Sequence, residues 1–233
     1  MRATVDALLV GTVQALAGSS HASGIDKHPV EDRLWLDIEG FAGDQQADRK
    51  HHGGPDKAVH HYAFDHYPSW TAEIGSREVL SRPGAFGENL STSGITEEDV
   101  CIGDIFMLGS ATVQVSQARQ PCWKLNKRFD FPGMSRLVQQ SGKTGWYYRV
   151  LETGWVAPGS DLTLLERRHP EWPLARILDV LYWKTLDAAA LEALCGIEVF
   201  PASWRQLFER RLQALEVEDW TRRLDGASRE VPQ

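Results

Sequence analysis

Residues 105–117 read Ile-Phe-Met-Leu-Gly-Ser-Ala-Thr-Val-Gln-Val-Ser-Gln and predict the clearest β-hairpin of the chain. The Gly-Ser pair at 109–110 is a turn dipeptide, and Val113 and Val115 alternate with polar residues in the second arm. That arm leads directly into Ala-Arg-Gln-Pro-Cys-Trp-Lys at 118–124. The hairpin therefore delivers one cysteine, with a cation on either side, to the end of a strand.

Cys122 is the candidate reactive residue of the chain. Arg119 and Lys124 flank it, and positive charge near a thiol favours the thiolate, which is the form that attacks electrophiles and binds metals. The alternative is a small residue of the core, because cysteine is among the most frequently buried residue types. The spacing alone leaves both interpretations open.

Further strands are expected on both sides of the hairpin. Strand patterns occur at 4–16, 33–38, 59–62, 146–151 and 162–165, and short helices are predicted at 67–74 and 134–142. Many short strands separated by turn signals indicate a sandwich or a barrel. The fold class expected from these patterns is mainly β with α, that is α+β.

The hydrophobic period changes to 3.6 residues after Glu166, which predicts three helices. A charged linker with two prolines occupies 167–173, and helical stripes follow from Leu174, after Asp187 as an N-cap, and around Trp204. We expect a β domain at 1–166 with its core at about 25–165, a three-helix appendage at 172–217 and a polar tail at 218–233 that frays.

Composition narrows the class of protein. The 233 residues carry a formal charge of -7, so a surface built to coat nucleic acid or anionic lipid is not expected. Three cysteines without a Cys-x-x-Cys pair cannot supply the four thiolates of a typical iron-sulfur cluster. No segment has the length of a membrane span, and the start of the chain lacks the apolar core of a signal peptide. We expect a cytoplasmic enzyme or carrier that takes electrons from elsewhere.

Several alternatives stay open on the residues alone. A zinc site in the histidine-rich segment 51–66 is disfavoured, because adjacent histidines on a strand face opposite ways. A DNA-reading helix in the appendage is disfavoured by the acidic balance of residues 174–233. A thiol enzyme would pair Cys122 with a histidine base, for which the candidates are His52, His60 and His61. An anion site is indicated by cations gathered on Gly-rich loops, namely Lys27, Arg49, Lys50, Lys57, Arg119 and Lys124.

Two strings taken together resemble one protein family. These are His-Gly-Gly-Pro-Asp-Lys-Ala at 52–58 and Gln-Ala-Arg-Gln-Pro-Cys at 117–122, supported by Gly-Asp-Gln-Gln-Ala-Asp at 43–48 and Phe-Gly-Glu-Asn-Leu at 86–90. With them, the chain resembles MOSC domain proteins, specifically the YiiM family of 6-N-hydroxylaminopurine resistance proteins. The resemblance covers nearly the whole chain, including the helical end.

The resemblance implies a MOSC-type β-barrel that carries the molybdenum cofactor, with Cys122 as the protein ligand of the metal. It implies cofactor-binding roles for residues that we assign as Lys27, His52, Lys57, Asn89, Gln117, Arg119 and Lys124. His61 or His52 is then expected to donate protons. A pyridoxal phosphate type of annotation is a further option at the level of the superfamily.

The activity that the resemblance implies is reduction of hydroxylaminopurines, amidoximes and hydroxylamines to the amines, which detoxifies base analogues. The electrons would come from an external reductase, such as a flavoprotein, and the helical appendage is a candidate docking or homodimer surface. Two other readings stay open, which are a non-enzymatic carrier of molybdopterin or sulfur and a metal-free Cys/His thiol enzyme.

Overall fold

The computed structural model describes residues 1–16, 19, 21–48 and 53–226. The predicted hairpin lies in the interior of the largest sheet, where β10 (Ile105–Leu108) and β11 (Ala111–Ala118) are antiparallel with Phe106 opposite Val113. The hairpin prediction is confirmed. β11 is almost wholly buried along its length, because helices contact it in addition to its strand neighbours. Its residues therefore do not show the exposed polar face that simple alternation predicts.

In the described residues, the largest sheet has nine strands in the order β1-β14-β10-β11-β12-β8-β9-β2-β5, and only β8 and β9 pair in parallel. The strands besides the hairpin are β1 (Arg2–Thr4), β14 (Asp161–Glu166), β12 (Trp146–Glu152), β8 (Val59–Ala63), β9 (Leu90–Thr92), β2 (Ala7–Val10) and β5 (His28–Pro29). Two smaller sheets contain β13 (Gly154–Val156), β6 (Leu34–Asp37) and β7 (Gly40–Phe41), and β3 (Gln14–Ala15) with β4 (Ala22–Ser23).

The large sheet is open, with β1 at one edge and β5 at the other. Only Val5 and Asp6 separate β1 from β2, and their backbone amides donate to Ser160 and Ser91 respectively, so the first ten residues touch both ends of the sheet. The strand pairings of the described residues nevertheless do not close the ring. The mixed α+β class is confirmed, whereas the β-barrel remains a prediction.

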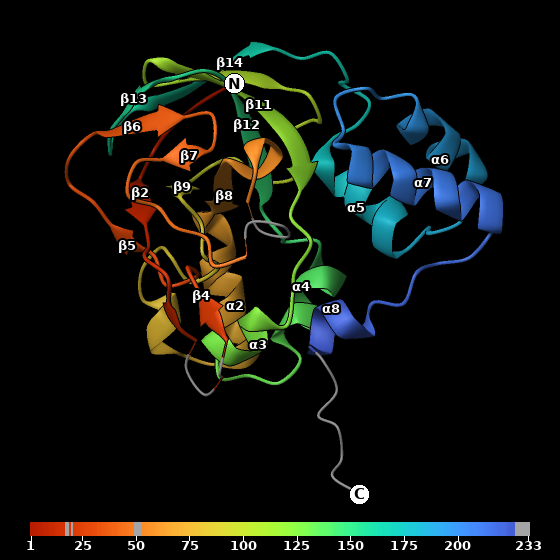
Figure 1. The fold of residues 1–233 in the computed structure, drawn as a ribbon, viewed down its shortest axis with the longest axis horizontal. Coiled ribbons are helices and arrows are strands. Elements are labelled where there is room, and N and C mark those ends of the chain that lie inside the picture. The colour runs from red at the N-terminus through yellow and green to blue at the C-terminus, as the bar shows by residue number, and fades with distance from the viewer. Residues whose placement is uncertain (17–18, 20, 49–52, 227–233) are drawn as a thin grey trace, which may run out of the picture.

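Short helices cover one end of the sheet. They are α2 (Tyr67–Ile74), α3 (Lys124–Arg128) and α4 (Met134–Ser141), and single 3-10 turns occur at η1 (Pro55–Lys57), η2 (Phe64–His66) and η3 (Glu78–Leu80). A separate apolar cluster fills the space beneath them, where the rings of Tyr62 and Phe86 stack with centroids 3.9 Å apart. Figure 1 shows these helices at the end of the molecule opposite β13 and β14.

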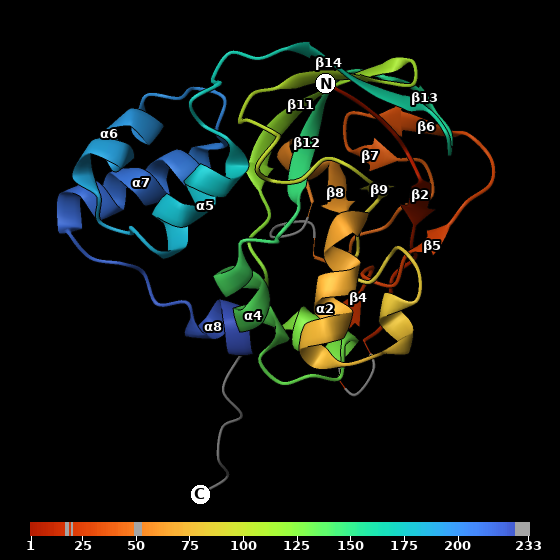
Figure 2. The ribbon, with the colours of Figure 1, turned by 180° about the vertical axis from the view of Figure 1, so that it is seen from behind.

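Three helices follow the sheet, as the 3.6-residue period predicts. They are α5 (Leu174–Tyr182), α6 (Ala188–Cys195) and α7 (Ala202–Ala214), and the Asp187 carboxylate caps α6 by accepting the Ala190 N–H at 3.1 Å. They form one group beside the strands (Figure 2). Their apolar residues nevertheless belong to the same hydrophobic cluster as those of the sheet.

The segment 167–173 is not a loose linker. Arg167 pairs with the buried Asp104 at 2.6 Å, and the backbones at Ile102 and Leu174 bond to Trp172 and Val100. Trp172 is itself buried. The expected appendage is therefore docked on the sheet, because charged and proline-rich residues that read as a linker satisfy buried partners here.

The end of the described chain also differs from the expectation. The sequence predicts a fraying polar tail from 218, but residues Thr221–Asp225 form a short helix, α8, in which Leu224 is buried. Both views place α8 beside α4, far along the chain from it (Figures 1 and 2). A single buried leucine among polar residues does not produce a helical pattern in sequence, so local periodicity misses this contact.

Candidate functional site

A pocket opens at the end of β11 and is bordered by loops from four separate parts of the chain. Its empty volume, which includes space open to solvent, is about 570 Å³. The residues that line it are Ser23, Gly24, Ile25, Lys27, Gln45, Gln46, Ala47, Asp48, Lys57, His60, Phe86, Gly87, Asn89, Arg119, Cys122, Lys124 and Tyr147. Most of the residues that the sequence singled out therefore meet here.

Cys122 lies in this pocket and is partly exposed. Arg119 and Lys124, its cationic neighbours in sequence, are both nearly buried and line the same pocket. Lys57 lies within electrostatic range of the Cys122 sulfur; burial lowers the pKa of its ammonium, and the nearby Asp48, Asp56 and Cys122 oppose that shift. The pocket thus joins one thiol to several cations, in a protein whose overall charge is negative.

Lys27 is held at the wall of the pocket by Asp44. Its Nζ lies 2.5 Å from Asp44 Oδ2, and the two side chains are only 7% and 1% exposed. Burial lowers the pKa of Lys27, while the charge of Asp44 opposes that shift. Asp44 also accepts the Gly11 N–H at 2.9 Å, so its carboxylate is anchored from two sides. Sequence reasoning missed Asp44 as a site residue, although it follows a glycine in a polar loop.

His60 and His61 point to opposite faces of β8, as adjacent strand residues must. His60 lines the pocket, and burial, followed by the charge of Arg119, lowers its pKa well below 6.5. His61 is fully buried in the core instead, where Nδ1 contacts Tyr148 Oη at 3.0 Å and Nε2 contacts Thr92 Oγ1 at 2.8 Å. The structure therefore places His61 in the core, with both ring nitrogens engaged away from the pocket, and a role as proton donor stays a prediction.

Two further residues predicted to bind the cofactor use their side-chain amides for hydrogen bonds within the protein. Asn89 lines the pocket, but its amide donates to the Leu9 carbonyl and to Asp44, while its Oδ1 accepts the His60 N–H. Gln117 does not line the pocket; it is buried, and its Nε2 donates to the Asp56 carbonyl at 3.3 Å. Both residues hold the pocket's shape. His52, also predicted to act here, lies outside the described residues.

Tyr147 is a lining residue that sequence reasoning missed. It stands opposite His60 in the pairing of β12 with β8, and their rings are 5.0 Å apart. Burial raises the pKa of its hydroxyl, and a hydrogen bond with Arg119 opposes that shift. Tyr147 is placed at the pocket by the register of β12 with β8, and no local pattern in the sequence indicates that register.

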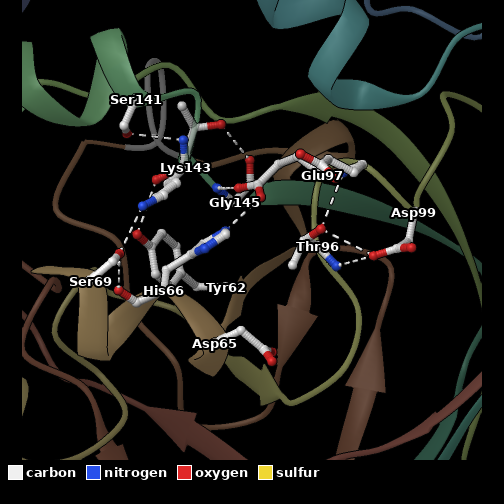
Figure 3. A network of polar contacts seen from close by, with 12 residues as sticks. Tyr62, Asp65, His66, Ser69, Thr96, Glu97, Asp99, Ser141, Lys143 and Gly145 are labelled. Atoms are coloured by element: carbon white, nitrogen blue, oxygen red, sulfur yellow. Dashed lines mark hydrogen bonds and ion pairs between the residues drawn. The ribbon is translucent and has the colours of Figure 1, made fainter.

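A buried polar network supports the strand end that carries Arg119. Glu97 Oε1 accepts the Gly145 N–H at 2.6 Å, and Glu97 Oε2 lies 2.7 Å from His66 Nε2 (Figure 3). The Gly145 carbonyl accepts the Arg119 N–H at 2.9 Å. Gly145 has φ +72°, and a Cβ at this position would lie 2.4 Å from the His61 carbonyl oxygen. Glycine is therefore required where the network meets β11.

Two pocket residues carry a buried polar atom that finds no partner among the residues that the structure describes. Within the described residues, Arg119 Nη1 and His60 Nε2 make no hydrogen bond. Unsatisfied groups of this kind are rare in folded proteins and often mark the place of a water, an ion or a ligand. The pocket therefore retains polar groups that a bound anion could satisfy.

The described residues contain no group of three or more His, Cys, Asp and Glu side chains arranged to hold a metal ion. None of the helices in the described part of the chain combines the length and apolar character needed to cross a membrane.

Comparison with known proteins identifies both regions of the chain. Residues 48–163 match the MOSC domain, and residues 172–215 match the YiiM-like, 3-alpha helix domain. The protein YiiM of Escherichia coli is 39% identical over 97% of this chain and 100% of its own length. The crystal structure of that protein superposes with a TM-score of 0.80, covering 96% of this chain and 98% of the other.

A protein of Gibberella moniliformis named a reductase is 40% identical over 70% of this chain, a match that spans 29% of its own length. Nothing in these comparisons supports the pyridoxal phosphate annotation. The domain matches, the full-length similarity and the shared fold agree, and the chain therefore belongs to the YiiM family of MOSC domain proteins.

Proposed function

We propose that this chain binds the molybdenum cofactor through Cys122 and reduces N-hydroxylated compounds to amines. The observation that carries the proposal is the convergence of Cys122 with Lys27, Lys57, Arg119 and Lys124 on one pocket. A lone cysteine among cations suits a ligand that offers both a soft metal and a phosphate.

The residues present fit that cofactor. A cysteine thiol is a soft ligand that binds transition metals once it has lost its proton. The phosphate of the pterin is an anion, for which Arg and Lys are the usual partners. Arg119 supplies a buried N–H that has no partner in the described residues, which a phosphate oxygen would satisfy.

Separate residues would take separate roles. Arg119, Lys124 and Lys57 are the proposed anion contacts, since all three line the pocket beside Cys122. Lys27 is already paired with Asp44, so its charge is largely balanced, and it would contribute to the shape of the wall.

The cofactor, when bound, supplies the two-electron redox chemistry, and the protein supplies binding, orientation and electrostatics. The overall reaction takes R–NH–OH, two electrons and two protons to R–NH2 and water. An external reductase, such as a flavoprotein, is the proposed electron source. His52, outside the described residues, remains the proposed proton donor now that His61 lies in the core. The name of the fungal relative is consistent with reductase chemistry.

The first test is elemental analysis for molybdenum after expression in a host that makes the cofactor. Wild type is compared with Cys122→Ser and with the matched control Cys195→Ser, whose thiol lies on α6, within the helical region. We expect near-stoichiometric molybdenum in wild type and control, and its loss in Cys122→Ser. Metal retained in Cys122→Ser would refute the ligand assignment.

The second test measures turnover of 6-N-hydroxylaminopurine by the loaded protein with a chemical reductant, following the amine product. Turnover that depends on molybdenum supports the reductase. Bound cofactor without turnover favours the carrier, and turnover in metal-free protein that alkylation of Cys122 abolishes favours the thiol enzyme. Either result would replace the proposed function.

A further inference from the structure

The C-terminal helix α8 contacts the residues on both sides of Cys122. Arg223 Nη1 donates to the Pro121 carbonyl at 2.6 Å, and the Trp123 N–H donates to the Arg223 carbonyl at 2.8 Å. One residue, about one hundred positions later in the chain, thus holds the backbone immediately before and immediately after the pocket thiol. Gly226, just beyond the helix, lies close to Trp123, since a Cβ at this position would be 3.3 Å from the indole ring.

α8 is itself fastened to the layer of short helices. Arg223 Nη2 donates to Gln139 Oε1 at 2.6 Å on α4. Leu224 is buried, and its carbonyl accepts from Asn126 Nδ2 at 2.9 Å and from Ser135 Oγ at 2.7 Å. These contacts hold Arg223 in one orientation, so its guanidinium bridges α4 and the Pro121 carbonyl.

The segment that leads to α8 is anchored on the three-helix region. The buried Arg211 of α7 forms a salt bridge with Glu218 at 2.8 Å and donates to the Leu181 carbonyl of α5 at 2.9 Å. Trp220 packs edge-on against Tyr182, with ring centroids 5.6 Å apart. The chain from 216 to 226 therefore runs as a strap from α7 to α8 (Figure 2). There Arg223 contacts the cysteine loop, residues 119–123.

We propose that Arg223 is a positioning residue for Cys122, and that the strap links the three-helix region to the pocket. The strap lies beyond both domain matches, which end at residues 163 and 215. A peptide segment held at both neighbouring residues has few backbone conformations, so the direction of the thiol is set by the strap. Displacement of a reactive group by about 1 Å can change its reactivity greatly.

The test measures alkylation of Cys122 by iodoacetamide in metal-free protein, with modified peptides quantified by mass spectrometry over time. Arg223→Gln removes the guanidinium, and Arg222→Gln is the matched control on an exposed face of the same helix. Cys195 in the same molecules serves as the internal reference. We expect the Cys122 rate to change by about fivefold in Arg223→Gln, because the hydrogen bond that holds the Pro121 carbonyl next to Cys122 is lost, and not in Arg222→Gln.

Arg223→Lys keeps one donor and is expected to restore part of the wild-type rate, which a purely structural defect would not predict. Leu224→Ala loosens the strap without touching the guanidinium and is expected to change the Cys122 rate in the same direction as Arg223→Gln. These two variants carry the test if Arg223→Gln fails to fold by circular dichroism.

Equal Cys122 rates in wild type, Arg223→Gln and Leu224→Ala, all folded, would overturn the inference. An equal change at Cys195 would also overturn it, since that result indicates general loosening. The measurement uses no molybdenum, so failure of the proposed function would not produce either outcome.

Discussion

His61 should make the protein lose stability as the pH falls below neutrality. Its ring is fully buried between Tyr148 and Thr92, and burial lowers its pKa from 6.5 to about 3. In the unfolded chain the same imidazole has its ordinary pKa and takes up a proton below pH 6.5. The unfolded state therefore binds more protons than the folded state between about pH 6.5 and pH 3, and stability is lost as the pH decreases through that window.

The size of the effect follows from the two pKa values of His61. pH 5 lies about 1.5 units below the pKa of the unfolded imidazole, which is therefore protonated, while the folded ring stays neutral. This difference in protonation corresponds to about 2 kcal/mol of lost stability. For a chain of this length, that lowers the melting temperature by about 4–8 °C. The pocket histidine His60, whose pKa is also lowered, adds a loss of the same sign.

The assay is thermal unfolding at pH 7 and pH 5, followed by circular dichroism, for wild type and His61→Gln. Glutamine can still hydrogen-bond within the core but does not titrate, so the variant should lose about 4–8 °C less than wild type between the two pH values. His28→Gln, whose side chain is 56% exposed, serves as the control and should fall as much as wild type. An equally steep loss in His61→Gln would refute the reasoning.

Three further predictions concern the pocket and its support. Lys27→Met leaves the buried Asp44 carboxylate without its cation and should lower the free energy of unfolding, measured in urea, by about 3–5 kcal/mol. The double variant Lys27→Met/Asp44→Asn should recover part of that stability, and a loss below about 1 kcal/mol in Lys27→Met would contradict the pairing. Gly145→Ala forces a methyl group onto a backbone oxygen and should lower the free energy of unfolding by about 3 kcal/mol. In the control Gly142→Ala, φ is similar but no atom lies within 4 Å of the new Cβ, so the loss should be about 1 kcal/mol; equal losses would contradict the close approach. Pyrophosphate should raise the melting temperature of the wild-type protein, and titration calorimetry should show that Arg119→Gln binds pyrophosphate about tenfold more weakly or worse. Unchanged affinity would remove Arg119 from the anion contacts.

The three-helix region contacts both the sheet and, through the strap, the residues next to Cys122. Buried partners join the sheet to the segment before α5, and the strap joins α7 to the cysteine loop. The YiiM-like helices are thus attached to the pocket domain at both of their ends. A change in the packing of α5 to α7 is expected to reach Cys122 through Glu218 and Arg223, which the alkylation experiment can follow.

Local features of this chain could be predicted from its sequence because their causes are local. The hairpin at 105–117 follows from alternation and a two-residue turn, and the stripe from Leu174 and the cap at Asp187 follow from helical period and capping. Cys122 could be singled out because its cationic neighbours are adjacent in sequence. The residue types of the pocket were also recognisable, since lysines and arginines on Gly-rich loops indicate an anion.

Only the tertiary structure decided which of these residues meet. Lys27, Asp44 and Asn89 converge from three segments, and the choice of His60 over His61 for the pocket depends on which face of β8 the sheet turns toward Cys122. The strap that ends at Arg223 depends on one buried leucine and on hydrogen bonds to backbone carbonyls, which are present in every sequence. Contacts between distant segments arise from the packing of complete elements, so no local pattern of residues encodes them.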